Sequence, residues 1–278
     1  MQLSSSIARR SFVLGSLGAL PLAAKVPSTR VGCQLNVFPR PVDFPEVLKR
    51  IAELKRLGFE ALECNVRFVE PELSRLSEAK AEMRKAGLDY YYCAHTELSR
   101  DFDELLKKAD TAAAFEAKRL AVNGAVLKPP RNERPSEEDL KAKVEKISRL
   151  GAHCHKAGLR LLYHNHVDEF FADGFELREF LRRTDPDHFS LLFDIGFPPP
   201  QQSVVSDFFA NHFARIDGIH LHDMRDPKPP LYDEVAARIE KTGWSGYLIL
   251  EEAANKSDTD INAVLTANRR IIRQTFGA

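Results

Sequence analysis

Histidines and carboxylates stand at the ends of four apolar runs in the second half of the chain. The runs are LLYHNH, SLLFD, GIHLHD and YLILEE. Their final polar residues are His164 with His166, Asp194, His220 with His222, and Glu251 with Glu252. A charged group at the end of a buried run costs free energy unless it is paired or bound to a metal. These residue types together suit a divalent cation such as Mn, Zn, Co or Mg, so the sequence predicts one such ion.

The spacing within the two histidine pairs supports a shared site. His164 and His166 are two residues apart, as are His220 and His222, so each pair points to one face of a strand. A single histidine at such a place is more often a core or loop residue. Four equivalent positions in succession favour the metal site instead.

These polar residues belong to a regular alternation of strands and helices. The segment 43–57 has an apolar stripe at helical spacing and ends at Gly58, and Ser136 is the predicted N-cap of a helix that ends at Gly158. Most strands are apolar without alternation, which suits parallel strands covered on both faces. The predicted strands cover residues 31–37, 59–65, 88–95, 118–124, 159–166, 189–195, 216–223 and 246–252.

Eight strands, each followed by a helix, predict a single-domain (β/α)8 TIM barrel over residues 30–276. A doubly wound open sheet is the main alternative. The count of eight, and the lack of a G-x-G-x-x-G turn after any strand, favour the barrel. All strand carboxyl ends face one mouth of a barrel, so polar residues on the earlier strands join the later ones there. The predicted substrate contacts are Glu63, His95, Asn123, His222 and Arg225.

The composition is that of an ordinary globular protein. The chain has 278 residues, of which 44% are hydrophobic and 29% charged, and its 40 basic side chains balance 40 acidic ones. This balance gives no net attraction to nucleic acid or to an anionic membrane. The four cysteines form no C-x-x-C pair and are predicted to be buried apolar residues. A homo-oligomer is compatible with the sequence.

The N-terminal segment 1–24 is predicted to be a twin-arginine signal peptide. Arg9 and Arg10 precede SFVL and an apolar run rich in Leu, Gly and Ala, which is too short to span a membrane. The segment therefore predicts export to the periplasm without a stable membrane anchor. The alternative is a hydrophobic tail on a cytoplasmic protein.

The motifs on the last four strands resemble those of the xylose isomerase-like barrel superfamily, in its sugar phosphate isomerase/epimerase branch. The resemblance covers roughly residues 30–276 and rests on LLYHNHVDEF, LLFDIGF, IHLHDM and YLILEE. It implies a sugar or polyol as the small-molecule partner and no nucleic acid. By motif, the metal ligands that it implies are His164, Asp194, His220 and Glu251.

Two positions depart from the family pattern. Members that epimerise ketoses usually carry Glu on strand five, whereas this chain has His164, so a symmetric mechanism with two glutamates does not transfer. The Y-H-x-H pattern is similar to that of inosose dehydratases and related members that act on keto-cyclitols or keto-sugars. Many relatives also carry His three residues after the strand-six Asp, where this chain has Phe197.

The resemblance implies a metal-dependent isomerase or epimerase of a sugar or keto-sugar that works through an enediolate. The ion would act as a Lewis acid, while Glu251 or His166 would remove the proton beside the carbonyl. A lyase that eliminates from a keto-cyclitol or 3-keto-sugar shares this first step and is an alternative. Two further alternatives are a non-catalytic secreted sugar-binding barrel and a three-zinc DNA repair endonuclease. Phe197 and the charge balance argue against the endonuclease.

Overall fold

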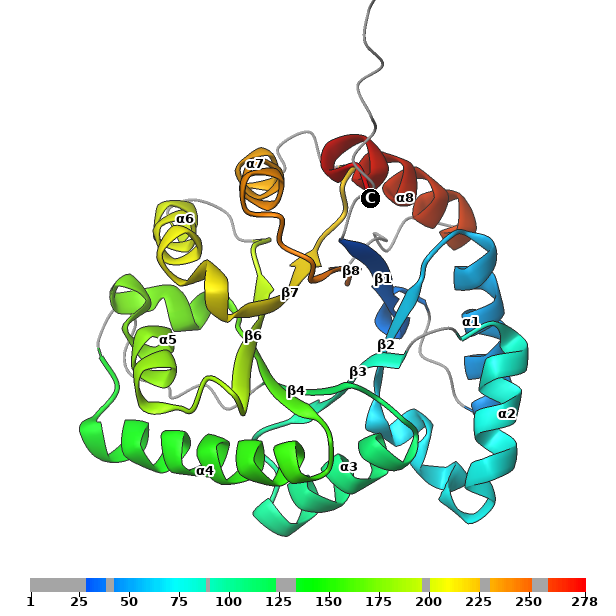
Figure 1. Ribbon diagram of the computed structural model, residues 1–278, viewed down its shortest axis with the longest axis horizontal. Coiled ribbons are helices and arrows are strands. Elements are labelled where there is room, and N and C mark those ends of the chain that lie inside the picture. Colours follow the sequence, from blue (N-terminus) through cyan, green and yellow to red (C-terminus); the bar gives the residue numbers. More distant parts are fainter. Residues whose placement is uncertain are drawn as a thin grey trace, which may run out of the picture.

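The structure is a computed structural model of the chain, and it describes residues 29–38, 43–88, 91–123, 134–196, 201–225, 231–251 and 260–278. Its parallel strands form a closed barrel in chain order, with β8 paired to β1. The helices surround the barrel as a ring (Figure 1). The predicted single-domain TIM barrel is therefore confirmed, and the open sheet is excluded.

The strands and helices alternate along the chain. The strands are β1 (Arg30–Gln34), β2 (Ala61–Asn65), β3 (Tyr91–Glu97), β4 (Arg119–Asn123), β5 (Arg160–His164), β6 (Phe189–Asp194), β7 (Ile216–Leu221) and β8 (Tyr247–Leu250). The helices are α1 (Phe44–Arg56), α2 (Leu76–Ala86), α3 (Phe102–Ala114), α4 (Glu137–Lys156), α5 (Phe171–Arg183), α6 (Gln201–His212), α7 (Tyr232–Thr242) and α8 (Ile261–Phe276).

Local signals in the sequence set several helix ends. The side chain of Ser136 accepts a hydrogen bond from the Asp139 N–H at 3.1 Å, which caps α4 as predicted. Gly58 and Gly158 follow α1 and α4 with φ angles of +85° and +77°, a left-handed conformation that favours glycine. Both predicted helix ends are therefore confirmed.

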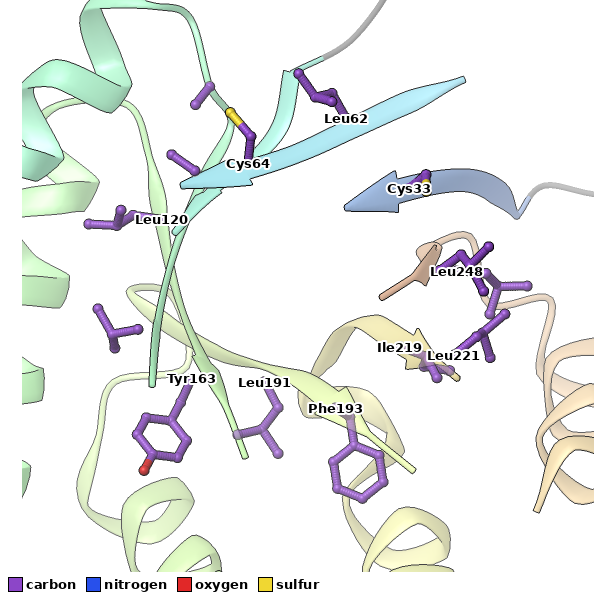
Figure 2. Packing of buried hydrophobic residues seen from close by; sticks show 14 of the residues in the cluster. Cys33, Leu62, Cys64, Leu120, Tyr163, Leu191, Phe193, Ile219, Leu221 and Leu248 are labelled. Carbon is purple, nitrogen blue, oxygen red and sulfur yellow. The ribbon is translucent and has the colours of Figure 1, made fainter. Parts of the chain in front are cut away.

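The strands carry apolar side chains on both faces. Figure 2 shows Leu191 and Phe193 pointing from β6 toward the surrounding helices, and this outer layer forms the main core. A smaller cluster fills the barrel interior. It comprises Ala61, Tyr92, Cys93, Ala121, Leu162, Leu192, Tyr247 and Ile249. The four cysteines are buried and free, as predicted.

Aromatic rings and an ion pair fill the amino-terminal end of the barrel. Tyr92 near the start of β3 stacks on Tyr247 at the start of β8, with ring centroids 4.3 Å apart. Asp217 accepts a hydrogen bond from the Tyr92 hydroxyl at 3.1 Å and pairs with Arg119 at 2.9 Å. This end of the barrel is therefore a packed core rather than an opening.

Strand β5 is shorter than the sequence predicts. The predicted strand 159–166 ends earlier, at His164, because the His166 N–H bonds to the Glu169 side chain instead of to a neighbouring strand.

The predicted signal peptide, residues 1–24, lies outside the described residues. Among the residues that the structure describes, no helix has both the length and the apolar character needed to cross a membrane.

Candidate metal centre

Three side chains converge at the carboxyl-terminal mouth of the barrel. His220 Nδ1 lies 2.7 Å from Glu251 Oε2 and 3.2 Å from His164 Nε2. His164 Nε2 lies 3.5 Å from the same Glu251 oxygen. The three residues come from β5, from β7 and from the position after β8, whose ends the barrel brings together. They therefore offer ligand atoms to one small volume.

Asp194, the last residue of β6, completes the cluster. Its Oδ2 lies 3.8 Å from His164 Nε2. Its Oδ1 accepts hydrogen bonds from His222 Nε2 and from the Gly196 N–H, each at 2.8 Å. The ligand atoms of Asp194, His222 and Glu251 all lie within 4.8 Å of one another, as do those of His164, His220 and Glu251. One oxygen of Asp194 is thus held by its neighbours while the other faces the cluster.

The protonation of these groups suits cation binding. Burial favours the neutral form of Glu251, but His220 and His164 outweigh it and lower its pKa to about 2. Burial also opposes the charge of Asp194, but the nearby imidazoles of His164 and His222 lower its pKa. Both carboxylates are therefore ionised at neutral pH. Two buried imidazoles and two carboxylates are a donor set that fits a borderline or hard divalent ion.

His220 is the charged centre of the metal-free cluster. Burial opposes its protonation, but the carboxylates of Glu251 and Glu63 raise its pKa well above the ordinary value for histidine. The side chain is fully buried, with one carboxylate on each ring nitrogen. This shift favours the imidazolium form, whose positive charge lies between the two acids.

Glu63 was predicted as a substrate contact, and the structure places it beside His220. Its Oε2 lies 2.9 Å from His220 Nε2, and its Oε1 accepts a hydrogen bond from Gln34 Nε2 at 2.7 Å. The residue is fully buried. Burial opposes ionisation of Glu63, but His220 outweighs it and lowers the pKa of this carboxyl group.

His166 and His95 lie near the cluster. The ring centroid of His166 is 4.6 Å from that of His164, and the His166 N–H donates to Glu169 Oε2 at 2.8 Å. His95 on β3 is buried, and its Nδ1 lacks a hydrogen-bond partner among the described residues. Burial lowers the pKa of both histidines. In His166, the neighbouring His164 lowers the pKa further. Both rings are therefore neutral at neutral pH.

The remaining predicted substrate contacts lie around the same mouth. Asn123 ends β4 and is half-buried, and its carbonyl accepts the Leu98 N–H at 2.8 Å. Arg225 follows β7, and its guanidinium pairs with Asp223 at 2.5 Å. A role for either side chain in substrate binding stays a prediction.

Asn165 is a structural residue of the site that the sequence analysis missed. Its Nδ2 donates to the Asp194 carbonyl at 3.0 Å, and its Oδ1 accepts the Asp194 N–H at 3.2 Å. The buried amide thereby continues the pairing between β5 and β6 past the last strand residues. Its position between His164 and His166, at the end of an apolar run, was the available signal.

A sequence profile of the xylose isomerase-like TIM barrel matches residues 51–274. The chain belongs to the xylose isomerase-like TIM barrel family. It is 24% identical to the inosose dehydratase of Geobacillus thermodenitrificans (strain NG80-2) over 198 residues, which cover 70% of this chain and 59% of that protein. The chain spans less than two thirds of the length of the curated relatives it matches.

Solved structures share the architecture of this xylose isomerase-like barrel. A sugar phosphate isomerase/epimerase from Parabacteroides distasonis ATCC 8503 superposes with a TM-score of 0.69 at 18% identity, covering 94% of this chain and 98% of that one. An L-ribulose 3-epimerase gives a TM-score of 0.72 at 14% identity, with coverages of 90% and 95%. At these identities the likeness shows the fold. Phe197, the second departure from the family pattern, lies outside the described residues.

Proposed function

We propose that this protein is a divalent-metal-dependent isomerase or epimerase of a sugar or keto-sugar that acts through an enediolate. The observation that carries the proposal is the convergence of His164, Asp194, His220 and Glu251 at the carboxyl-terminal mouth of the barrel. Active sites of TIM barrels lie at this mouth. Membership of a family of sugar-modifying enzymes supports the same conclusion.

The four converging side chains would hold the ion. A bound divalent ion at this place would polarise the substrate carbonyl, acidify the adjacent C–H and stabilise the enediolate. Glu251 is ionised and its side chain is 16% exposed, whereas His164 and His220 are almost fully buried. Glu251 is therefore the ligand that can also reach a substrate and accept its proton.

His166 is the second candidate for moving a proton. Its ring lies beside that of His164 and is neutral, because burial lowers its pKa. A neutral imidazole can accept a proton through one nitrogen while it donates through the other. Delivery of the proton to another carbon completes an isomerisation, and delivery to the opposite face of the same carbon completes an epimerisation.

A lyase is the second candidate function. The inosose dehydratases among its relatives and the presence of His164 on β5 favour it. Removal of the first proton is common to both reactions, and the lyase then expels a β-substituent in place of reprotonation. The proposed partner is a small sugar or polyol in either case. Export by the segment 1–24 and a homo-oligomeric state stay predictions.

Elemental analysis followed by solvent exchange tests the proposed function. The purified protein should contain about one equivalent of Mn, Zn, Co or Mg, and keto-sugars or keto-cyclitols should take up deuterium from heavy water in its presence. Uptake with an unchanged formula identifies the isomerase or epimerase, and loss of water or of another β-substituent identifies the lyase. Saturable sugar binding without deuterium uptake would contradict both and favour a binding protein.

Gly196→Ala is predicted to weaken metal binding. A Cβ atom at this position would overlap the His222 imidazole, so the ring must move away from Asp194. Asp194 then loses one of the two hydrogen bonds that fix its Oδ1. We expect the dissociation constant of the metal to rise about tenfold, the lower end of the effect for a residue that orients a ligand. Calorimetric titration of the metal-free variant measures it, and an affinity equal to that of the wild type would contradict it.

Metal binding is predicted to release about one proton at pH 7. Because Glu251 and Glu63 raise the pKa of His220 despite its burial, the imidazole is protonated in the metal-free protein. A cation can bind its Nδ1 only after that proton leaves. The metal affinity should therefore rise about tenfold per pH unit below the pKa of His220 and level off above it. Calorimetry in buffers of different ionisation enthalpy counts the protons released.

A further inference from the structure

Glu63 is a fully buried carboxylate whose oxygens both have partners inside the barrel. One oxygen faces His220 Nε2 at 2.9 Å, and the other accepts the amide of Gln34 at 2.7 Å. A buried carboxylate without a partner would be costly, so these two contacts account for its presence in the interior. They also leave it no exposed surface with which to meet a substrate.

The contact with Glu63 distinguishes the two ring nitrogens of His220. A carboxylate oxygen accepts hydrogen bonds, so the 2.9 Å contact between Glu63 Oε2 and His220 Nε2 favours the tautomer with the proton on Nε2. The other nitrogen, Nδ1, faces Glu251 at 2.7 Å and His164 at 3.2 Å. In the neutral ring it is then Nδ1 that holds the free electron pair, and that pair points into the cluster.

Gln34 fixes the carboxylate itself. Its amide comes from β1, the strand beside β2, in register with Glu63. By donating to Oε1, it leaves Oε2 as the atom that meets His220. Gln34, Glu63 and His220 thus form a buried chain of side-chain contacts that links β1, β2 and β7.

We propose that Glu63 is a positioning residue that holds the Nε2–H of His220 and directs Nδ1 at the metal. This inference rests on the proposed function, because it assigns a role at the same metal centre. Carboxylates that accept the second N–H of a metal-bound histidine fix its tautomer and raise its basicity as a ligand. Glu63 therefore strengthens metal binding without touching the ion or the substrate.

The test compares metal affinity in Glu63→Gln and Asp217→Asn. Glu63→Gln preserves volume but removes the charged acceptor, and we expect the dissociation constant for Mn²⁺ or Zn²⁺ to rise about 10- to 100-fold. Asp217 is a matched control, because it lies on β7 with His220 but at the opposite end of the barrel, paired with Arg119. Asp217→Asn should lower thermal stability and leave metal affinity unchanged.

A second measurement uses the wild-type protein, so it does not depend on how a variant folds. Nitrogen-15 NMR of the protein loaded with Zn²⁺ should show His220 bound through Nδ1, with a slowly exchanging Nε2–H. Metal on Nε2, or an affinity of Glu63→Gln equal to that of the wild type, would overturn the inference while leaving the proposed function intact. Failure of the wild type to bind either metal would overturn both.

Discussion

Loss of proton exchange between substrate and solvent, by about 10³-fold or more, is the expected result of Glu251→Gln and of His220→Ala. Glu251 Oε2 lies within 3.5 Å of both His164 and His220, so the amide variant removes the charge of the proposed ligand and the proposed base together. His220→Ala removes the proposed ligand at the centre of the cluster. Because Gln keeps the volume of Glu, the first variant should fold normally.

Deuterium incorporation into the substrate, followed by proton NMR, measures this loss. Glu97→Gln provides a control, because Glu97 ends β3 at the same mouth of the barrel but pairs with Arg100 at 2.7 Å. Its exchange rate should match that of the wild type. Exchange that persists in both the Glu251 and the His220 variants would rule out the proposed mechanism.

Lys143→Met is expected to give the largest loss of stability. Lys143 on α4 is buried and donates to Glu176 at 2.5 Å and to the Tyr163 hydroxyl at 2.9 Å. The substitution leaves Glu176 as a buried charge without its partner. Breaking a buried ion pair in this way costs about 3–5 kcal/mol. For a chain of this size the melting temperature should fall by about 10 °C.

The double variant Lys143→Met/Glu176→Met separates the ion pair from simple packing. Replacing both partners by apolar side chains removes the uncompensated charge, so this variant should be more stable than Lys143→Met alone. Thermal unfolding followed by circular dichroism gives the comparison. A single variant within about 1 kcal/mol of the wild type, or a double variant less stable than the single one, would contradict the prediction.

The barrel was predictable because its signals are local. Apolar runs marked the strands, and Ser136 and Gly158 marked helix ends by their own backbone chemistry. The same logic placed Asp194 and His220 at strand ends, and the closed sheet then brings them to one mouth. The strand assignments therefore predicted that Asp194 and His220 lie at the same mouth.

The partners of these residues were not predictable. Glu63 and His220 are 157 positions apart, and their contact depends on how side chains cross the barrel interior. His166 was predicted on a strand but lies beyond its end, since Glu169 takes its N–H. The link of Asn165 to Asp194 likewise exists only after β5 and β6 have paired. Such contacts arise from the assembled fold rather than from periodicity.

The stacked rings of Tyr92 and Tyr247 help to close the amino-terminal end of the barrel. With that end of the barrel filled, the proposed ion and sugar would both enter from the carboxyl-terminal mouth. An ion held among the buried imidazoles of His164 and His220 would then lie beneath any sugar that occupies the mouth. Binding would therefore be ordered, with the metal first and the sugar second, and a bound sugar would slow the escape of the metal.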